Sequence, residues 1–510
     1  MSFAGEARVH ELARRRFLQG AGAVGVAGAL GTGSASATSS YQWLSGDHHV
    51  HTQYSYDGMY TIEQQLRGAL RHGTDWLVIT DHGHQSHEKN SVEATAADVA
   101  RAARKFPHLL LWHGMEWNVP GAEHGTVFFE DCRDEAGVLR DFERQFDWRL
   151  NGQEASNPAN EAKALDAVRW LQTKIRNGTM KSALVFVNHP MRNGRVAPHE
   201  LRNMRDLAPD IVVGMEGSPG AQGDGDPLRG PGGHRGGYAN SPGGNSWPAY
   251  PAEAYRTYGG FDWMTAKVGG MWDALLAEGR GWWITSNSDS HFNSRDTIVR
   301  VTEPGNQFDL FGKHLDPIDA GPPQVLPPYV DFFPCEFSRT VVGARRRTRG
   351  AVMEGLRAGR VWVTHGGLVE DLRFSVYGSG GGATLGERLR VRRGSDVTVV
   401  VKVRRATRPN SAGLIPKLRR IDLIRGAVTG PSHDRAAMVS PRVSVEESFE
   451  PRWHYSVFTH TFRNVREPFY LRLRGTDGNR GFEPQADVPG AANPWEDLWC
   501  YSNPIFVEVR

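Results

Sequence analysis

Between residues 41 and 365, short apolar runs alternate with helix-like segments, and the runs end in residues that can bind a metal. The runs are DWLVITDHGH, HLLLWHGMEWN, SALVFVNHP, DIVVGMEGSPG and GWWITSNSDSH. Segments with helical spacing separate them; TIEQQLRGALRHG, for example, places Ile62, Leu66 and Leu70 on one face. Parallel strands are buried on both faces and read as continuous apolar runs. The alternation therefore predicts an α/β fold built on a parallel sheet or barrel.

The predicted strand ends concentrate histidine and carboxylate residues. In a β/α barrel the active site lies at the C-terminal ends of the strands. The stretch GDHHVHTQYSYDG adds an earlier cluster, in which His49 and His51 point the same way along an extended chain while His48 faces elsewhere. Other strand ends carry further candidates: Asp81, His82, Glu116, His124, His189, Asp289 and His291. Each alone could be a capping or core residue, but together they predict a metal site.

A stretch rich in glycine and proline, residues 217–251, interrupts this pattern directly after one strand end. It is either a disordered insertion or a lid over the site, with His234 and Arg235 as substrate contacts. The alternation closes with a helix and a strand in RGAVMEGLRAGRVWVTHGG. We therefore expect one domain over residues 41–365.

Beyond residue 366 the pattern changes to short β-rich runs with turn residues between them. These runs are LRFSVYG, SDVTVVVKVRR, LRRIDLIRG, HYSVFTHTF, FYLRLRG and NPIFVEVR. A series of short strands without a long helix is typical of an all-β sandwich. The sequence thus predicts a sandwich-like domain over residues 366–510.

The N-terminal stretch ARRRFLQGAGAVGVAGALGTGSASATSS has the features of an export signal. Arg14 and Arg15 precede Phe-Leu, a Gly/Ala-rich apolar segment and an Ala-x-Ala cleavage signal. We expect a twin-arginine signal peptide over residues 1–37, cleaved after Ala37, and a secreted or periplasmic protein. The segment is too short and glycine-rich to predict a stable membrane anchor.

Charge and cysteine spacing argue against nucleic acid binding and against a thiolate metal site. The 510 residues carry a formal charge of only +3, and the basic run ARRRTRG has no aromatic residues within it, so nucleic acid binding is not expected. The cysteines Cys132, Cys335 and Cys500 lie far apart in the sequence. One disulfide is compatible with this spacing, but a thiolate metal site is not predicted.

The motifs DHHVHT, TDHG, GMEW, NHP and SDSH resemble, in order and spacing, those of the polymerase and histidinol phosphatase (PHP) family of metal-dependent hydrolases. The resemblance spans residues 47 to about 365. It implies a distorted (β/α)7 barrel holding up to three divalent metals. The implied ligands are His49, His51, Glu116 and Asp289 for one metal, Glu116 with His124 and His189 for a second, and Asp57, His82 and His291 for a third. Asp57 departs from the family pattern, because it lies one residue later than in the common HTxxSDG form.

The ligand types suit Zn²⁺, Mn²⁺ or Fe²⁺, and we expect two or three such ions. Clustered cations lower the pKa of bound water and stabilise a developing oxyanion, so no side-chain nucleophile is required. Asp81, His84 and Glu216 are candidates for orienting ligands or transferring protons, or they are turn residues. Arg192 and Arg195 either bind a phosphate or are solvated.

Three functions are compatible with this sequence. The family resemblance favours a secreted phosphoesterase acting on a small-molecule or cell-envelope phosphoester. The alternative is a carbamate, ester or amide hydrolase, because the β-rich tail and GRVWVTHGG also resemble the carbaryl-hydrolase branch of PHP-like proteins. A non-catalytic binding module with structural metals is the third. It is disfavoured because structural metal sites usually fill every coordination position with protein atoms.

Overall fold

The computed structural model describes residues 41–226, 235–293, 296–324, 331–488 and 493–510. The predicted signal peptide and His234 lie outside these ranges, so twin-arginine export and the role of His234 stay predictions. The described residues, from 41 onward, fall in one compact unit. None of the helices in the described ranges is long and apolar enough to span a membrane.

Strands of the N-terminal part lie side by side around the metal-capable residues. In spatial order they are β1 (Gln42–Asp47), β2 (Trp76–Ile79), β3 (Leu110–Asn118), β4 (His124–Glu130), β5 (Ser182–Val187), β6 (Val212–Ser218) and β9 (Trp283–Ser286). β4 runs antiparallel to both neighbours, while the other pairs are parallel. A parallel bridge between Val50 and Ser290, just past β1 and β9, connects the two ends of the series. The predicted α/β fold with parallel strands is confirmed; the exact barrel count stays a prediction.

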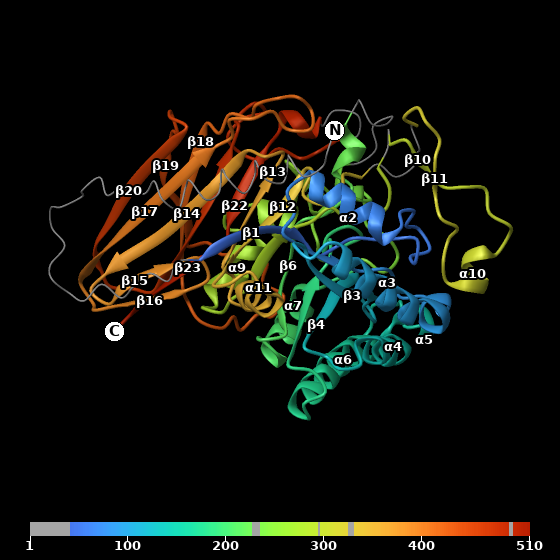
Figure 1. The fold of residues 1–510 in the computed structure, drawn as a ribbon. Coiled ribbons are helices and arrows are strands. Elements are labelled where there is room, and N and C mark those ends of the chain that lie inside the picture. Colours follow the sequence, from blue (N-terminus) through green and yellow to red (C-terminus); the bar gives the residue numbers. More distant parts are fainter. Residues whose placement is uncertain (1–40, 227–234, 294–295, 325–330, 489–492) are drawn as a thin grey trace. The chain divides into compact units, whose positions relative to one another are not determined.

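Helices pack on the outside of these strands, with α3 and α4 against β3, α6 against β5 and α7 against β6 (Figure 1). Thr61 begins α2 with a capping box, and Ile62 and Leu66 of the predicted apolar face are buried whereas Leu70 is exposed. The helices are α2 (Ile62–Arg71), α3 (Val92–Lys105), α4 (Glu135–Phe146), α5 (Trp148–Asn151), α6 (Pro158–Arg176), α7 (Pro198–Leu207), α8 (Trp263–Ala266), α9 (Met271–Ala277), α10 (Gln307–Phe311) and α11 (Arg349–Arg357). Short strand pairs are β7 (Thr257–Tyr258) with β8 (Phe261–Asp262), and β10 (Ile298–Val299) with β11 (Ile318–Asp319).

The sheet continues past β1 into the C-terminal part of the chain. The order from β1 is β12 (Ser338–Ala344), β13 (Val361–His365), β22 (Trp499–Ser502), β21 (Phe469–Thr476), β23 (Ile505–Val509) and β16 (Arg388–Val391). From β21, the sheet also extends to β18 (Arg420–Ala427), which pairs with β19 (Val443–Phe449). The sheet therefore crosses the predicted boundary at residues 365 and 366, and this boundary stays a prediction.

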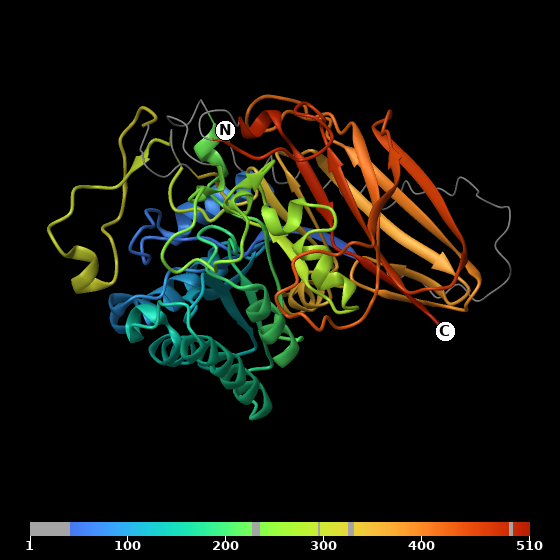
Figure 2. The ribbon, with the colours of Figure 1, turned by 180° about the vertical axis from the view of Figure 1, so that it is seen from behind.

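A second, antiparallel sheet lies over the C-terminal strands (Figure 2). Its order is β15 (Gly381–Thr384), β14 (Val369–Gly378), β17 (Ser395–Arg405) and β20 (Tyr455–Val465). Phe374 and Val401 from this sheet share one apolar core with Leu471 and Val507 from the other. The C-terminal part is therefore rich in antiparallel strands, as predicted.

The described part of the Gly/Pro-rich insertion packs on the loop after β5. The Ala239 amide donates to the Arg192 carbonyl at 3.2 Å, and the Trp247 amide donates to the Gly194 carbonyl at 2.7 Å. The expectation for Arg235 is corrected: its guanidinium is buried and pairs with Asp487 and Asp497 at 3.4 and 3.3 Å, so it is not available to a substrate. A lid role for the insertion stays a prediction.

All three cysteines are free thiols, so the compatible disulfide does not form.

Glu200 makes stability depend on pH. Its carboxylate is buried at the start of α7 and accepts the Ala197 amide at 2.6 Å. Burial raises the pKa of Glu200 from 4.5 to about 8. The folded state therefore binds this proton more tightly than the unfolded state, and its contribution to stability is lost as pH rises from about 4.5 to about 8. We expect Glu200→Gln to flatten the fall in unfolding midpoint between pH 5 and pH 9, measured by urea denaturation at each pH. An equal fall in the unfolding midpoint of the wild type and of Glu200→Gln would contradict the raised pKa of Glu200.

Candidate metal centre

His49 and His51 converge just beyond the end of β1, as the strand alternation predicts. Their Nε2 atoms lie 3.1 Å apart. Both atoms face Oδ1 of Asp289, at 2.9 and 3.0 Å. His48 points away: its ring stacks on Phe186 with centroids 4.6 Å apart. Three ligand atoms from two strand ends therefore surround one point.

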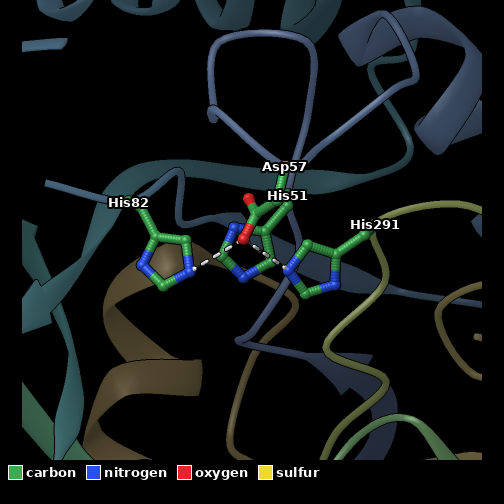
Figure 3. Close-up of side chains that lie close together, drawn as sticks. All are labelled: His51, Asp57, His82 and His291. Carbon is green, nitrogen blue, oxygen red and sulfur yellow. Dashed lines mark ion pairs between the residues drawn. The ribbon is translucent and has the colours of Figure 1, made fainter. Parts of the chain in front are cut away.

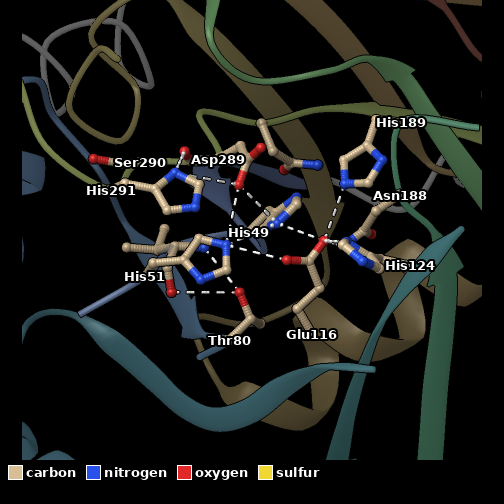
Figure 4. A network of polar contacts seen from close by, with 12 residues as sticks. His49, His51, Thr80, Glu116, His124, Asn188, His189, Asp289, Ser290 and His291 are labelled. Atoms are coloured by element: carbon tan, nitrogen blue, oxygen red, sulfur yellow. Dashed lines mark hydrogen bonds and ion pairs between the residues drawn. The ribbon is translucent and has the colours of Figure 1, made fainter. Parts of the chain in front are cut away.

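Glu116, on β3, connects this group to the histidines of neighbouring strands (Figure 4). Its Oε1 lies 3.0 Å from His49 Nε2, and 3.1 Å from both His124 Nδ1 and His189 Nε2. Its Oε2 lies 3.2 Å from His51 Nε2. The carboxylate thus contacts histidines of more than one ligand group, and the bridging role that the family resemblance implies for it stays a prediction.

A third group forms around Asp57 (Figure 3). Asp57 Oδ2 lies 3.3 Å from His82 Nε2 and 3.4 Å from His291 Nε2. His51 stacks on His291, with ring centroids 4.1 Å apart. Although Asp57 lies one residue late in its motif, the loop still brings its carboxylate to the predicted partners.

The side chains fall into three overlapping groups whose ligand atoms lie within 4.8 Å of one another. They are His49, His51, Glu116 and Asp289; His82, Glu116 and His124; and His51, Asp57, His82 and His291. The first set matches the predicted first metal. The other two groups differ from the implied ligand sets. His51 and His82 each belong to two groups, whereas His189 belongs to none of the three and contacts Glu116. The individual ligand assignments stay predictions.

Two of these residues have left-handed backbone conformations, which non-glycine residues rarely adopt. His189 has φ of 27° and Asp289 has φ of 49°. Such strain costs about 1–3 kcal/mol per residue and concentrates at functional sites. At His189 the amide donates to Glu216 Oε2 at 2.8 Å, a contact that fixes the strained turn. The fold therefore holds both side chains in orientations that a relaxed strand end would not give.

Neighbouring charges shift the pKa values of the carboxylates and histidines in this cluster. Burial alone raises the pKa of Asp289, but the imidazoles of His49 and His291 outweigh it and hold that pKa well below its ordinary value. The pKa of Glu116 is held low by surrounding histidines in the same way. Conversely, burial lowers the pKa of His49, but Asp289 and Glu116 raise it well above its ordinary value. The carboxylates are therefore anionic donors that favour a cation between them, and a metal would displace the His49 proton.

The residues fit divalent cations. Two imidazole Nε2 atoms facing each other at 3.1 Å, with a carboxylate oxygen against both, are the arrangement of ligands around an ion. His82 Nδ1 and His189 Nδ1 are buried without a hydrogen-bond partner among the described residues. Nitrogen and carboxylate donors without thiolate suit Zn²⁺, Mn²⁺ or Fe²⁺.

Asp81 and Glu216 lie beside the ligand groups. Both Asp81 oxygens accept from Thr52, the amide at 2.6 Å and the hydroxyl at 2.8 Å, which fixes the loop after His51. Glu216 Oε1 lies 2.8 Å from His49 Nδ1. His84 Nδ1 accepts the Ser86 amide at 3.1 Å. The Asp81 and Glu216 contacts are compatible with an orienting role, whereas the His84 contact is local to its own turn. The orienting and proton-transfer roles of the three residues stay predictions.

The two candidate arginines differ. Arg192 Nη2 lies 3.4 Å from His124 Nδ1 and 3.6 Å from the buried carboxylate of Glu123, and its side chain is 28% exposed. Arg195 pairs with Glu154 at 2.9 Å and lies 3.9 Å from Glu123. Arg192 is therefore the arginine of this pair that contacts the cluster.

Sequence reasoning missed several residues that shape the site. Asp47 Oδ1 accepts the His49 amide at 2.9 Å and Oδ2 accepts the Ser288 amide at 2.8 Å, so one carboxylate joins the ends of β1 and β9. Asn188 Nδ2 donates to Glu116 Oε1 at 2.9 Å. Both residues stand inside motifs noted above, which was a usable signal. Asp331, whose carboxylate accepts the His291 amide at 2.7 Å, stands in a loop without any pattern.

Comparison with known proteins gives a local match. Residues 47–141 match the PHP domain model. No curated protein matches the chain. Among solved structures, a two-domain protein from Bacteroides vulgatus that contains a predicted PHP-like metal-dependent phosphoesterase is similar at 14% identity and TM-score 0.34, covering 91% of this chain and 98% of that one. A Bifidobacterium adolescentis protein, whose name proposes a metal-dependent phosphoesterase, is similar at 16% identity and TM-score 0.21, covering 34% and 76%. The PHP match includes His49, His51, Asp57, His82, Glu116 and His124.

Proposed function

We propose that this protein is a metal-dependent phosphoester hydrolase. The observation that carries the proposal is the sharing of Glu116, His51 and His82 between ligand groups. Shared ligands would hold bound ions next to one another, and paired ions can stabilise the attacking and leaving oxygens of phosphoryl transfer. Bound divalent ions would supply a water nucleophile of lowered pKa and positive charge for the phosphoryl oxygens. The PHP match over residues 47–141 supports the same class of chemistry.

The chain's own residues give the site its preference for an anion. Arg192 lies against His124, so its guanidinium stands at the edge of the ligand groups and is partly open to solvent. Glu123 holds this guanidinium in place, and its own pKa, which burial raises, is brought below its ordinary value by Arg192 and His189. A guanidinium in this position binds a phosphoryl oxygen by a charge-assisted hydrogen bond. A neutral carboxyl ester or carbamate has no charged oxygen, so its hydrogen bond with this guanidinium is weaker.

The decisive experiment is a substrate screen with the purified full-length protein. We expect hydrolysis of a simple aryl phosphate or aryl phosphodiester that is abolished by a chelator and restored by Mn²⁺ or Zn²⁺. Turnover of naphthyl acetate or naphthyl carbamate without any phosphoester turnover would overturn the proposal in favour of the ester and carbamate class. Absence of turnover in every class by metal-replete protein would favour the binding module.

Arg192→Ala tests the source of the preference. We expect the KM for an aryl phosphate to rise about ten- to a hundredfold, because a hydrogen bond between charged partners contributes about 1.5–3 kcal/mol. Arg195→Ala is the matched control and should change KM much less, since its guanidinium is already paired with Glu154 at 2.9 Å. Steady-state kinetics with both variants measures the difference. Equal effects of the two variants would exclude a specific role for Arg192.

A further inference from the structure

Among the residues that the structure describes, no carboxylate forms an ion pair with the guanidinium of Arg149 on α5. Its side chain is half-buried beside the metal centre. Within the ranges that the structure describes, its guanidinium has neutral partners: Nε donates to Asn118 Oδ1 at 3.2 Å and Nη2 donates to Tyr56 Oη at 2.8 Å. Other arginines near the site, Arg192 and Arg195, each have a carboxylate partner. A partly desolvated cation without a counterion favours an anion from outside the chain.

The position of Arg149 is built by several buried contacts. Asp147, the N-cap of α5, accepts the Arg149 amide on Oδ1 at 2.9 Å. Asp147 Oδ2 accepts the Asn118 amide at 3.1 Å and its side-chain Nδ2 at 2.8 Å, which fixes the amide group that receives Arg149 Nε. Gly83 approaches so closely that a Cβ there would lie 2.0 Å from Asp147 Oδ2. The guanidinium is therefore held in one place before any ligand binds, which lowers the entropic cost of binding.

Tyr56 connects Arg149 to the metal centre. Its ring stacks on His82, with centroids 5.0 Å apart, and the Arg149 Cζ lies 4.5 Å from the same ring. His314 Nε2 contacts the Tyr56 carbonyl at 2.8 Å and fixes the backbone there. Arg149 thus stands one aromatic ring away from a residue that belongs to two ligand groups. At this separation it reaches a part of the substrate other than the phosphoryl group held at the ions.

We propose that Arg149, held by Tyr56 and Asn118, binds a second anionic group on the substrate, and that the natural substrate is therefore a phosphoester carrying a further phosphate or carboxylate. The inference rests on the proposed phosphoester hydrolysis and deepens it. Tyr56 is a positioning residue in this arrangement, because its hydroxyl oxygen accepts from Arg149.

The test compares phenyl phosphate with the three isomers of carboxyphenyl phosphate, using metal-replete full-length protein. We expect the wild type to prefer at least one isomer about tenfold or more in kcat/KM, and Arg149→Met to bring that ratio near one. Tyr56→Phe keeps the ring on His82 but removes the hydroxyl, so it should lower the ratio partly. Calorimetric titration with phenylphosphonate and the matching carboxyphenylphosphonate should show the same loss of preference in Kd.

Arg144→Met, on neighbouring α4, is the matched control, because Arg144 is largely exposed and pairs with Glu88; it should leave the ratio unchanged. Metal content and circular dichroism establish that each variant is folded and loaded. A wild type that hydrolyses phenyl phosphate but prefers no carboxylated isomer would overturn the Arg149 proposal alone, as would a preference that survives Arg149→Met in both kinetics and binding. Failure to hydrolyse any phosphoester would instead overturn the proposed function.

Discussion

Glu116→Gln should abolish activity and strip the protein of metal. Both oxygens of Glu116 contact histidines of the ligand groups, at 3.0 to 3.2 Å, and the residue belongs to two of the three groups. Glutamine has the same shape but removes the negative charge and turns an amide NH₂ toward donors. Partners that only orient metal ligands already account for about 10- to 100-fold in affinity or activity. We therefore expect a loss of kcat/KM beyond about a hundredfold, with fewer ions per chain by elemental analysis.

Glu130→Gln is the control for this variant. Glu130 is also a buried carboxylate and lies on the neighbouring strand β4. It stands at the other end of this strand from His124 and pairs with Lys181. We expect this variant to keep its metal and its activity. Unchanged metal content in Glu116→Gln would contradict the ligand assignment, whereas loss of metal in both variants would point to a general loss of structure.

The N-terminal strands and helices were predictable because each is specified locally. β5 lies within SALVFVNHP, and α2 lies within TIEQQLRGALRHG. Both depend on continuous apolar runs or on helical spacing, which a single stretch of sequence displays. The β-rich tail was predictable for the same reason, since the middle of β17 alternates buried residues with partly or fully exposed ones.

The continuous sheet was not predictable, because it depends on pairing between distant segments. β1 pairs antiparallel with β12, so that Ser45 lies opposite Val341. Nothing in either strand specifies the other, since backbone hydrogen bonds carry no sequence information. The same limitation applies to β13 and β22, which carry the sheet into the C-terminal part.

The candidate site likewise has a part that the sequence predicted and a part that it could not predict. Spacing predicted that His49 and His51 would point together, and the family resemblance implied which residues would share a metal. The sharing of His51 and His82 between groups depends on side-chain directions and on the strained turns at His189 and Asp289, which no spacing encodes. Arg149 was missed because α5 is a short helix outside every motif, and only its contacts with Tyr56 and Asn118 relate it to the site.

Asp273→Ala should destabilise the protein more than substitutions on its surface. Asp273, on α9, is fully buried and receives Nε and Nη2 of Arg472 on β21, both at 2.8 Å. Tyr470 donates to the same carboxylate at 2.8 Å. Removing the carboxylate leaves a buried guanidinium without its partner, which costs about 3–5 kcal/mol in the free energy of unfolding. Urea denaturation of the purified protein measures this change.

A double variant separates the ion pair from simple loss of packing. Asp273→Ala with Arg472→Met removes both charges, so it should be less destabilised than the sum of the single variants. Asp166→Ala, which breaks an exposed pair with Arg169 on α6, should cost no more than about 1 kcal/mol. An Asp273→Ala effect as small as that of Asp166→Ala would show that the buried pair contributes little. A large effect would show that the pairing of α9 with the C-terminal strand β21 contributes to the stability of the chain.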